Sequence, residues 1–524
     1  MKKKLYSLLS VATAVGACVF ALTACGNDEK KGKPEPKPDY NNVVIDGLND
    51  VFIDKDTESF DLLGGVTATY TFEDNTKVSL DDDIRTVLPN QAVVKDGKVT
   101  FTECGDYNIV YYVNDADGNH SAATRTVKVR NIYNCYWMSA TLPVLYCALD
   151  IVSNNYKSML TFTRADTLDI DTLDDDRFFY KVNGATNANL REAWAMTARL
   201  AYEDEYSYFR LFMTDVYSQS EIFSMMRYHI PSYRYEVKLV SDGGFTYNSA
   251  FAAYRNENSF DTWQANKKTY NAIVDKALKG EFTTVNANTG EMSIEYNGVK
   301  YSDDIAAIGP LNKMAIMAAQ RDNVELWCGY PETLVSKDPK VQAEIEKAHM
   351  PKKAPEEMYK NLSAEQKATF LKLCGLDKDE FDKTYFNKQG DYLIITGTNP
   401  FIGSLTDSEF ADVLKNIVAD FQGYNILFKP HPKALEPTDA MPKTKAVLQE
   451  NNIMLLPGRL PMEVLTWVYS DVALGGFDSS LFMAVPQGNT KFFIAKDADA
   501  LSELSKQLYD DGAFGNPKFY WKAA

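Results

Sequence analysis

The chain has 524 residues, carries a formal net charge of −17, and is 45% hydrophobic and 24% charged. This composition is that of an ordinary globular protein, and the length exceeds what a single hydrophobic core organises, so several domains are expected. The strong negative charge repels phosphate backbones, which argues against a nucleic-acid-binding protein.

The first 24 residues have the pattern of a secretion signal. Three lysines, Lys2–Lys4, precede an apolar run from Leu8 to Leu22 that is too short to span a membrane. The sequence Leu22-Thr-Ala-Cys25 looks like a lipobox, so Cys25 is expected to be the lipidated first residue of a lipoprotein on the extracytoplasmic face of a bacterial membrane. A plain secretory signal or a poorly cleaved anchor is the alternative. Residues 25–41, where prolines alternate with charges, are expected to form a flexible tether.

Residues 42–130 are expected to form a small β-sandwich. Val66–Phe72, Asn108–Val113 and Thr124–Val129 alternate in the way of half-buried strands, and a turn-forming cluster lies at Asp115–Asn119. Several short strands at this spacing predict an immunoglobulin-like sandwich. The segment contains no candidate for chemistry, so a spacer or glycan-contacting module is the favoured interpretation.

Residues 131–388 alternate between helical and strand patterns. Helices are predicted over Leu190–Tyr202, Gln219–Tyr228 and Thr269–Leu278, and strands over Tyr208–Met213 and Val237–Val240. A small β-hairpin is expected within residues 280–303. Such alternation is typical of a Rossmann-like α/β domain, which the C-terminal segment 505–524 is expected to complete.

Asp242 is a candidate general base in this domain. It follows the strand Val237–Val240 and precedes Gly243 and Gly244, which allow a close approach of the backbone to a ligand. A carboxylate at a strand end in a cleft can accept a proton from a substrate hydroxyl. An ordinary Asp-Gly turn is the alternative interpretation.

Residues 389–504 contain short, unbroken apolar runs typical of strands buried on both faces of a parallel sheet. In an open α/β sheet, ligands bind outside the carboxyl ends of the strands. Each predicted strand is followed by polar or turn-forming residues. The strands are Tyr392–Ile395, Ile426–Phe428, Ile453–Leu456 and Val472–Leu474, and the residues that follow them include Thr396-Gly397-Thr398, Lys429-Pro430-His431-Pro432, Pro457-Gly458-Arg459 and Gly475-Gly476.

The side chains at these ends are suited to a nucleotide phosphate. Two prolines flank His431 and stiffen its loop, and a protonated imidazole can donate to a phosphate. Ser479 and Ser480 precede an apolar run, Leu481–Val485; if that run is a helix, its N-terminal N–H groups attract an anion. Glu463 could accept from ribose hydroxyls. A rigid surface turn, a simple helix cap and a first-turn helix carboxylate are the respective alternatives.

Taken together and in this order, these segments resemble a known family. KPHP at 429–432, LPMEVL at 460–465 and GGFDSSLFMAVP at 475–486 look like the His-Pro, Glu and Ser motifs of bacterial sialyltransferases of glycosyltransferase family 80. VKLVSDGGFTY at 237–247 resembles the acidic motif of that family. The sequence departs from the family at Ser241, where an acidic residue is usual, at Pro430 in place of Gly, and at Gly244 in place of Ser.

The resemblance implies a GT-B architecture, in which two Rossmann-like domains face each other across a cleft, behind the immunoglobulin-like sandwich. It implies an inverting, metal-independent transfer of sialic acid from CMP-sialic acid to a galactose-type glycan acceptor, with no other cofactor. Asp242 would deprotonate the acceptor hydroxyl. The donor would be held at its phosphate by His431, Ser479 and Ser480, near cytosine by Lys429 and Pro432, at the ribose by Glu463, and along the cleft by Thr396, Gly397 and Thr398.

Two rival hypotheses remain open. One is a GT-B transferase that uses another nucleotide sugar, because Ser241 and Pro430 could mark a changed choice of donor or acceptor. The other is a catalytically inactive, glycan-binding surface lipoprotein. The five cysteines beyond Cys25 are odd in number and irregularly spaced, and no histidine lies near carboxylates at metal-ligand spacing. Neither a disulfide framework nor a metal site is therefore expected.

Overall fold

The computed structural model describes residues 37–55, 58–163, 167–173, 175–304, 314–483, 485 and 488–522. The predicted signal, the lipobox and Cys25 lie outside these residues, as does most of the predicted tether. The chain divides into two compact units. The first contains the residues up to Leu48 together with Gly65–Val87 and Val110–Thr124, and the second contains the remainder of the chain.

The first unit consists of short antiparallel strands. Tyr111 and Val113 are buried while Tyr112 between them is half-buried, which is the alternation that the sequence predicts for a sandwich strand. A hydrogen bond from Ser121 Oγ to the carbonyl of Tyr40 (2.8 Å) holds the start of the described chain. The strands are β1 (Val44–Asp46), β4 (Thr67–Thr71) and β5 (Lys77–Ser79) in one sheet, and β6 (Arg85–Val87), which pairs with the end of β9 (Gly105–Asn114).

The second unit begins with short strands, one of which pairs with a long strand that continues into the first α/β sheet. A single strand, β10 (His120–Met138), runs without a break through the expected domain boundary at residue 130. The ring of Phe52 packs on Tyr208 at 4.1 Å, and the carboxylate of Asp54 accepts from the Ile132 N–H (2.8 Å). Beside β10 lies β2 (Val51–Asp54), and β3 (Phe60–Asp61), β8 (Lys98–Phe101) and β7 (Ala92–Lys95) form a separate small sheet.

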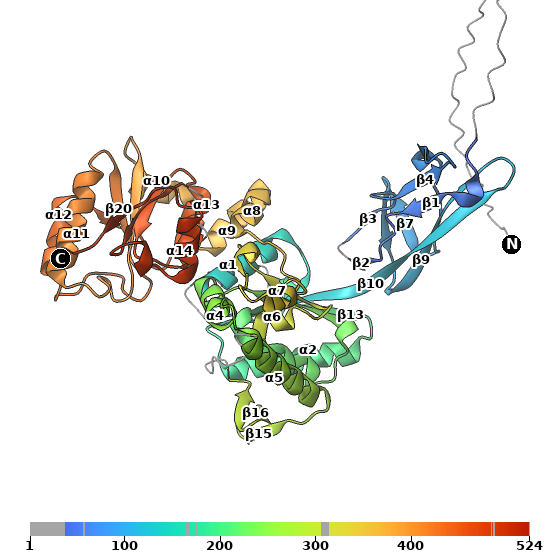
Figure 1. Ribbon diagram of the computed structural model, residues 1–524, viewed down its shortest axis with the longest axis horizontal. Helices are drawn as coiled ribbons and strands as arrows, with labels where there is room; N and C mark the ends of the chain where they lie inside the picture. Colours follow the sequence, from blue (N-terminus) through green and yellow to red (C-terminus); the bar gives the residue numbers. More distant parts are fainter. Residues whose placement is uncertain are drawn as a thin grey trace, which may run out of the picture. The chain divides into compact units, whose positions relative to one another are not determined.

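The first α/β domain is built on six parallel strands (Figure 1). Met159, Leu160 and Phe162 of one strand are all fully buried. Because adjacent residues of a strand point to opposite faces of the sheet, both faces must be covered. In sheet order the strands are β12 (Phe178–Asn183), β11 (Lys157–Phe162), β10, β13 (Ser207–Thr214), β14 (Tyr235–Val240) and β18 (Val324–Trp327). Its longer helices are α1 (Thr141–Ser153), α2 (Asn187–Glu203), α4 (Gly244–Tyr254) and α5 (Phe260–Leu278).

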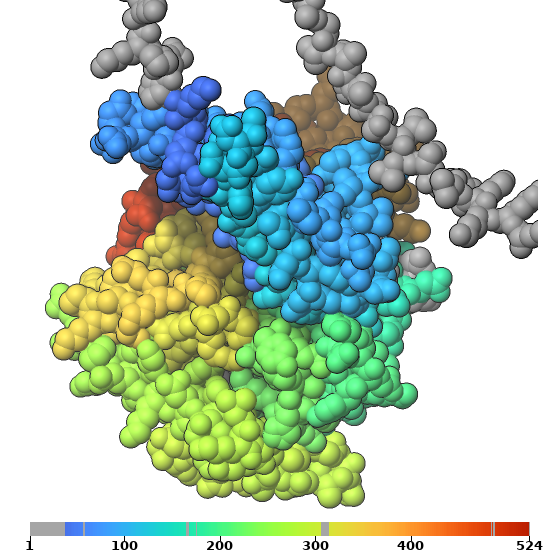
Figure 2. All heavy atoms as spheres, turned by 90° about the vertical axis from the view of Figure 1, so that its right-hand side faces the viewer, coloured from blue at the N-terminus to red at the C-terminus, as the bar shows by residue number. Residues whose placement is uncertain are grey.

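Shorter elements complete this domain. The predicted helix at 219–228 is a single α-turn, α3 (Gln219–Glu221), continued by a π-helical segment, Ile222–Met226. The predicted hairpin is a three-stranded sheet that Figure 2 shows on the surface in yellow-green. Its strands are β15 (Thr283–Asn286), β16 (Glu291–Tyr296) and β17 (Val299–Ser302), and the remaining helices are α6 (Ala315–Ala318), α7 (Pro339–Ile345), α8 (Pro355–Asn361), α9 (Ala364–Leu373) and α10 (Lys378–Tyr385).

The second α/β domain also has six parallel strands with helices on both sides. Figure 1 shows α11 and α12 on one side and α13 and α14 on the other. Leu393 and Ile395 point into the core beneath α11 and α12, and Ile394 between them points into the core on the opposite face. In sheet order the strands are β21 (Met454–Leu455), β20 (Asn425–Lys429), β19 (Tyr392–Thr396), β22 (Ala473–Gly476), β23 (Thr490–Ile494) and β24 (Lys518–Tyr520), and the helices are α11 (Asp407–Asp420), α12 (Pro442–Glu450), α13 (Met462–Val468) and α14 (Glu503–Asp510).

Two sequence expectations differ from the structure at the C-terminal end. The segment 505–524 was expected to complete the first domain, and its helix α14 does contact that domain, where Arg255 of α4 lies against Glu503 and Gln507. Strand β24 instead pairs with β23 of the second sheet, because Phe519 and Tyr520 continue its aromatic core. The helix expected at Leu481–Val485 is a short 3₁₀ turn, Ser480–Met483.

Candidate active site at the strand ends

Asp242 lies two residues after β14, in a turn held by the neighbouring strand end. Its backbone N–H donates to Asp215 Oδ1 and to Thr246 Oγ1, both at 3.0 Å. Asp215 follows β13, and the parallel register of Thr214 with Val240 places the two strand ends side by side. Burial raises the pKa of the Asp215 carboxyl to about 6, and hydrogen bonds from Thr246 and from the Asp242 N–H oppose that rise.

The Asp242 turn lies against the Ser motif of the second domain. Gly243 has φ +78°, and a β-carbon added there would lie 3.0 Å from the Cβ of Ser480. Only glycine combines this left-handed backbone with so close an approach. The structure therefore brings the candidate base and the candidate phosphate-holding serine together, although they are separated by more than two hundred residues in the sequence.

His431 lies in the loop that follows β20 and is half-buried. The backbone N–H of Lys433 donates to its Nδ1 at 3.1 Å, and its own carbonyl accepts from the Ala434 N–H at 2.8 Å. Because Nδ1 accepts in this arrangement, the proton of the neutral ring is on Nε2. The loop thus fixes which imidazole nitrogen can donate. Pro432 beside it is exposed.

Lys429 is buried rather than extended into the cleft. Its Nζ donates to the carbonyls of Pro430 (3.0 Å) and Gly458 (2.8 Å), which ties together the loops after β20 and β21. Burial lowers the pKa of Lys429 to about 8, with the Glu463 carboxylate opposing that shift. Burial also raises the pKa of Glu463, which is the second residue of α13. The two predicted donor-binding residues are therefore electrostatic partners.

Ser479 is exposed and Ser480 is half-buried at the start of the 3₁₀ turn. Because this turn is so short, an anion would be held by individual hydroxyl and N–H groups and not by a helix dipole. Asp478, which the sequence analysis did not single out, accepts from Ser502 N–H (2.7 Å) and Ser505 Oγ (2.6 Å) at the start of α14. It anchors the serine pair to the second domain.

Thr396, Gly397 and Thr398 lie at the end of the central strand β19. Thr396 is buried, and the Gly397 N–H donates to the carbonyl of Lys429 at 2.9 Å. A β-carbon on Gly476 would overlap Thr396, so glycine allows β22 to end against this turn. The predicted donor residues after β19, β20 and β22 thus form one connected edge of the sheet.

Tyr330, which follows β18, is a second residue that the sequence analysis did not identify. Its hydroxyl donates to the carbonyl of Met483 (2.7 Å), and its N–H donates to Tyr247 Oη (2.9 Å). It connects the first domain to the Ser-motif turn. Tyr330, Ser241, Gly243 and Met483 line a pocket behind the Asp242 turn.

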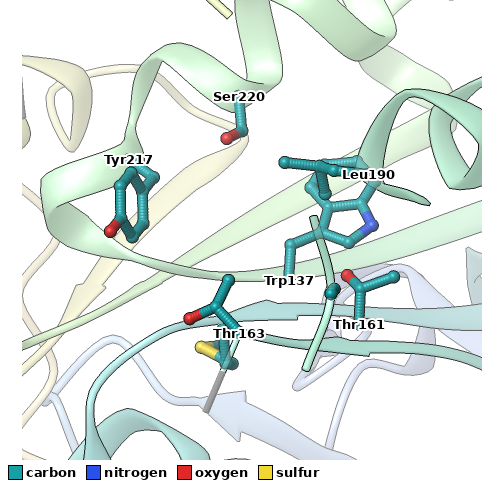
Figure 3. A pocket seen from close by; sticks show the side chains of 8 residues that line it. Trp137, Thr161, Thr163, Leu190, Tyr217 and Ser220 are labelled. Atoms are coloured by element: carbon teal, nitrogen blue, oxygen red, sulfur yellow. The ribbon is translucent and has the colours of Figure 1, made fainter. Parts of the chain in front are cut away.

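Another pocket opens at the carboxyl ends of β10 and β11 in the first domain (Figure 3). It lies near the Asp242 turn. Asp215 accepts a hydrogen bond from the Asp242 N–H, and Tyr217, two residues further along the chain, lines the pocket. The indole Nε1 of Trp137 is buried and has no hydrogen-bond acceptor among the described residues. The lining residues are Trp137, Met138, Thr161, Thr163, Ala185, Leu190, Tyr217 and Ser220.

Among the described residues, no three His, Cys, Asp or Glu side chains come together as metal ligands. None of the helices in the described part of the chain combines the length and apolar character that crossing a membrane requires.

Two family models match parts of the chain. Residues 352–516 match the model described as sialyltransferase PMO188, and residues 45–129 match the model described as bacterial surface protein, Ig-like domain. A comparison with curated protein sequences finds no match.

Solved structures with the same fold include bacterial sialyltransferases. An α/β-galactoside α-2,3-sialyltransferase from Photobacterium phosphoreum has a TM-score of 0.55 at 14% identity, covering 74% of this chain and 98% of its own. A 2,6-sialyltransferase from a Vibrionaceae Photobacterium species, solved with the donor product CMP and the acceptor substrate lactose, has a TM-score of 0.53 at 15% identity over 90% of this chain and 95% of its own. These likenesses confirm the expected fold class, two Rossmann-like domains in a GT-B arrangement with an immunoglobulin-like module before them.

Proposed function

Since the chain carries a sialyltransferase-family domain on a GT-B fold, we propose that it transfers sialic acid from CMP-sialic acid to a galactose-type glycan acceptor, with inversion and without a metal. The observation that carries this proposal is the contact between the Asp242 turn and Ser480. It joins a candidate proton acceptor from one domain to a candidate phosphate-binding group from the other.

In this proposal Asp242 removes the proton of the acceptor hydroxyl as that oxygen attacks the anomeric carbon. The bond from that carbon to the CMP phosphate breaks, and negative charge builds up on the phosphate. His431 donates from Nε2 to the phosphate, and Ser479 and Ser480 add hydroxyl donors. The rest of the rate acceleration comes from positioning, because the acceptor and the donor are held at fixed strand ends.

The acceptor sugar would enter beside the pocket lined by Trp137 and Tyr217. This pocket combines aromatic and hydroxyl groups, which are the groups that stack on and hydrogen-bond to a sugar. On the donor side, Glu463 would accept from the ribose and the loop of Lys429 and Pro432 would border the cytosine. Lys429 would act there by shaping the loop, because its Nζ is already bonded to two carbonyls.

Purified protein tests the proposal directly. Incubation with CMP-sialic acid and lactose is expected to yield sialyllactose and CMP, and CMP is expected to raise the melting temperature more than UDP or GDP does. The isosteric Asp242→Asn variant is the matched control and should bind CMP without transferring. Transfer only from a UDP-sugar would support a transferase with another donor. Folded protein that neither binds CMP nor acts on any nucleotide sugar would support an inactive glycan-binding protein.

The proposal also includes location. Cys25 would carry a lipid that holds the chain on the extracytoplasmic face of a bacterial membrane, and the proline-containing segment that follows it would act as the tether. Cys25→Ser is expected to move the protein from the membrane fraction to the soluble fraction without changing its activity. A variant that stays with the membrane would contradict lipid attachment at this residue.

A further inference from the structure

Asp215 is a buried carboxylate in contact with the Asp242 turn. Only 1% of its surface is exposed, and it lies at the end of β13, next to the end of β14. One carboxylate oxygen accepts from the backbone N–H of Asp242 (3.0 Å) and the other accepts from Thr246 Oγ1 (2.7 Å). A carboxylate this far from solvent is unfavourable unless hydrogen bonds compensate it, so its presence here needs a reason.

A chain of hydrogen bonds in the turn leads to this carboxylate. Thr246 Oγ1 donates to Asp215 and accepts from the Asp242 N–H (3.0 Å) and from Ser241 Oγ (3.1 Å). Ser241 Oγ in turn accepts from the Gly243 N–H (3.1 Å). Each hydroxyl has one proton, so the direction of every bond is fixed once Asp215 accepts at both oxygens.

We propose that Asp215 is a positioning residue for the transfer reaction, which fixes the Ser241–Gly243 turn through Thr246 and so aims the Asp242 carboxylate at the acceptor hydroxyl. This inference rests on the proposed role of Asp242 as the base. Asp215 acts through the turn and is not itself expected to contact substrate. Since Gly243 of the same turn lies against Ser480, a displaced turn would also disturb the alignment of acceptor and donor.

An amide at this position could not reproduce the pattern. Asparagine has one acceptor oxygen, so its NH₂ group would face either the Asp242 N–H or the hydroxyl of Thr246. In the first case two donors oppose each other, and in the second the chain of hydroxyl bonds must reverse. Asp215→Asn is therefore expected to fold, since it keeps the shape and removes a buried charge, but to leave the turn in a different arrangement.

The test compares Asp215→Asn, Thr246→Val and Thr246→Ser with the wild type. We expect the first two to lower kcat for transfer by roughly 10–100-fold, the scale of misplaced catalytic groups. The rise in melting temperature caused by CMP should be unchanged, because the donor is bound by the other domain. Thr246→Ser, which keeps the hydroxyl, should recover most of the rate lost in Thr246→Val.

Three outcomes would overturn the inference. If Asp215→Asn has a kcat within twofold of the wild type, the carboxylate does not position the base. If kcat and the CMP-induced shift fall together in both Asp215→Asn and Thr246→Val, the residues serve only the stability of the fold. If the folded wild type transfers no sugar from any nucleotide donor, the proposed function fails, and this inference fails with it; activity in the wild type separates that case from the first two.

Discussion

Gly243 and Ser480 meet where the two α/β domains approach each other, and a β-carbon on residue 243 would lie only 3.0 Å from the Cβ of Ser480, closer than an ordinary van der Waals contact. One residue belongs to the turn that carries Asp242 and the other to the turn that follows β22. The distance between the candidate base and the candidate phosphate site is therefore set by direct contact of two backbone turns. Small changes at this contact should have large effects on transfer.

Gly243→Ala tests this contact. The substitution places a methyl group 3.0 Å from Ser480 Cβ and forces alanine into a left-handed backbone, which destabilises the turn by about 1–2 kcal/mol. We expect transfer to fall by roughly 100-fold, since displacement of reacting groups by an ångström has effects of that size. Gly244→Ala is the matched control: its nearest neighbour would be 3.5 Å away, and its activity should stay within a few-fold of the wild type.

Asp242 and His431 should differ in what they contribute. Asp242→Ala is expected to lower transfer by roughly 10²–10⁴-fold, the usual contribution of a general base, with CMP affinity almost unchanged. His431→Ala should lower transfer and also weaken CMP binding by roughly 1–3 kcal/mol, because a charge-assisted hydrogen bond to phosphate is lost. Calorimetric titration with CMP separates the two. Loss of CMP binding in Asp242→Ala would contradict the role of Asp242 as a base that acts on the acceptor. Transfer at the wild-type rate in His431→Ala would contradict the role of His431 at the phosphate.

Lys429→Met should act through stability and loop shape. The substitution keeps the buried stem and removes the two hydrogen bonds from Nζ, leaving the carbonyls of Pro430 and Gly458 without that donor. The free energy of unfolding should fall by about 2–4 kcal/mol, and CMP binding should weaken because the loops after β20 and β21 separate. The exposed Lys433, whose side chain can be changed without affecting its N–H bond to His431, gives the control Lys433→Met. Equal stability of the two variants would contradict this role.

The pH dependence of stability should report on Asp215. Burial raises its folded-state pKa to about 6, above the ordinary value of 3.8, so the folded state binds this proton more tightly than the unfolded state. The resulting stabilisation is present below about pH 4 and is lost as the pH rises through 6. Cys328, which Asp215 also influences, has its pKa raised to about 12 by burial and stays neutral throughout.

Asp215→Asn removes this titration. Relative to the variant, the wild type should lose about 2–3 kcal/mol of unfolding free energy between pH 4 and pH 7.5. Urea unfolding of both proteins at several pH values measures the difference. A constant difference across this range would mean that Asp215 has an ordinary pKa.

The strand ends were the part of the site that sequence patterns could predict. The apolar runs that precede Thr396, Lys429 and Gly475 are strands in the structure, as expected, because short unbroken apolar runs are typical of a sheet covered on both faces. Asp242 likewise follows its predicted strand. What these residues contact could not be predicted, since nothing in the sequence shows that Lys429 is buried with its Nζ bonded to two loop carbonyls.

Asp215 could not be identified as part of the site from the sequence. It stands two residues after the predicted strand Tyr208–Met213, a position equivalent to that of Asp242, but no glycine or motif marks it. The sequence showed only that Ser241 replaces an acidic residue of the resembled family. The link between Ser241 and Asp215 depends on the pairing of β13 with β14, which is a long-range contact that local patterns do not contain.

The boundary at residue 130 has an experimental consequence. Alternation of apolar and polar residues ends there because the strand passes from a half-exposed sheet into a fully buried one, yet β10 continues from His120 to Met138. A chain shortened to begin at Asn131 therefore loses the part of β10 that pairs with β2, the ring contact of Phe52 with Tyr208, and the acceptor that Asp54 provides for the Ile132 N–H. These contacts lie in the middle of β10 and at the start of β13, and the Asp242 turn lies beyond the carboxyl end of β14.

We therefore expect the shortened chain to be less stable and to remain active. Its melting temperature should fall by several degrees, because a buried aromatic contact and a buried hydrogen bond are lost together. The rate of transfer per folded molecule should stay within a few-fold of the full chain. Phe52→Ala in the full-length protein removes only the ring contact and should give a smaller fall in melting temperature. A shortened chain that is folded by circular dichroism, binds CMP normally and has lost transfer would instead mean that residues before Asn131 take part in binding the acceptor.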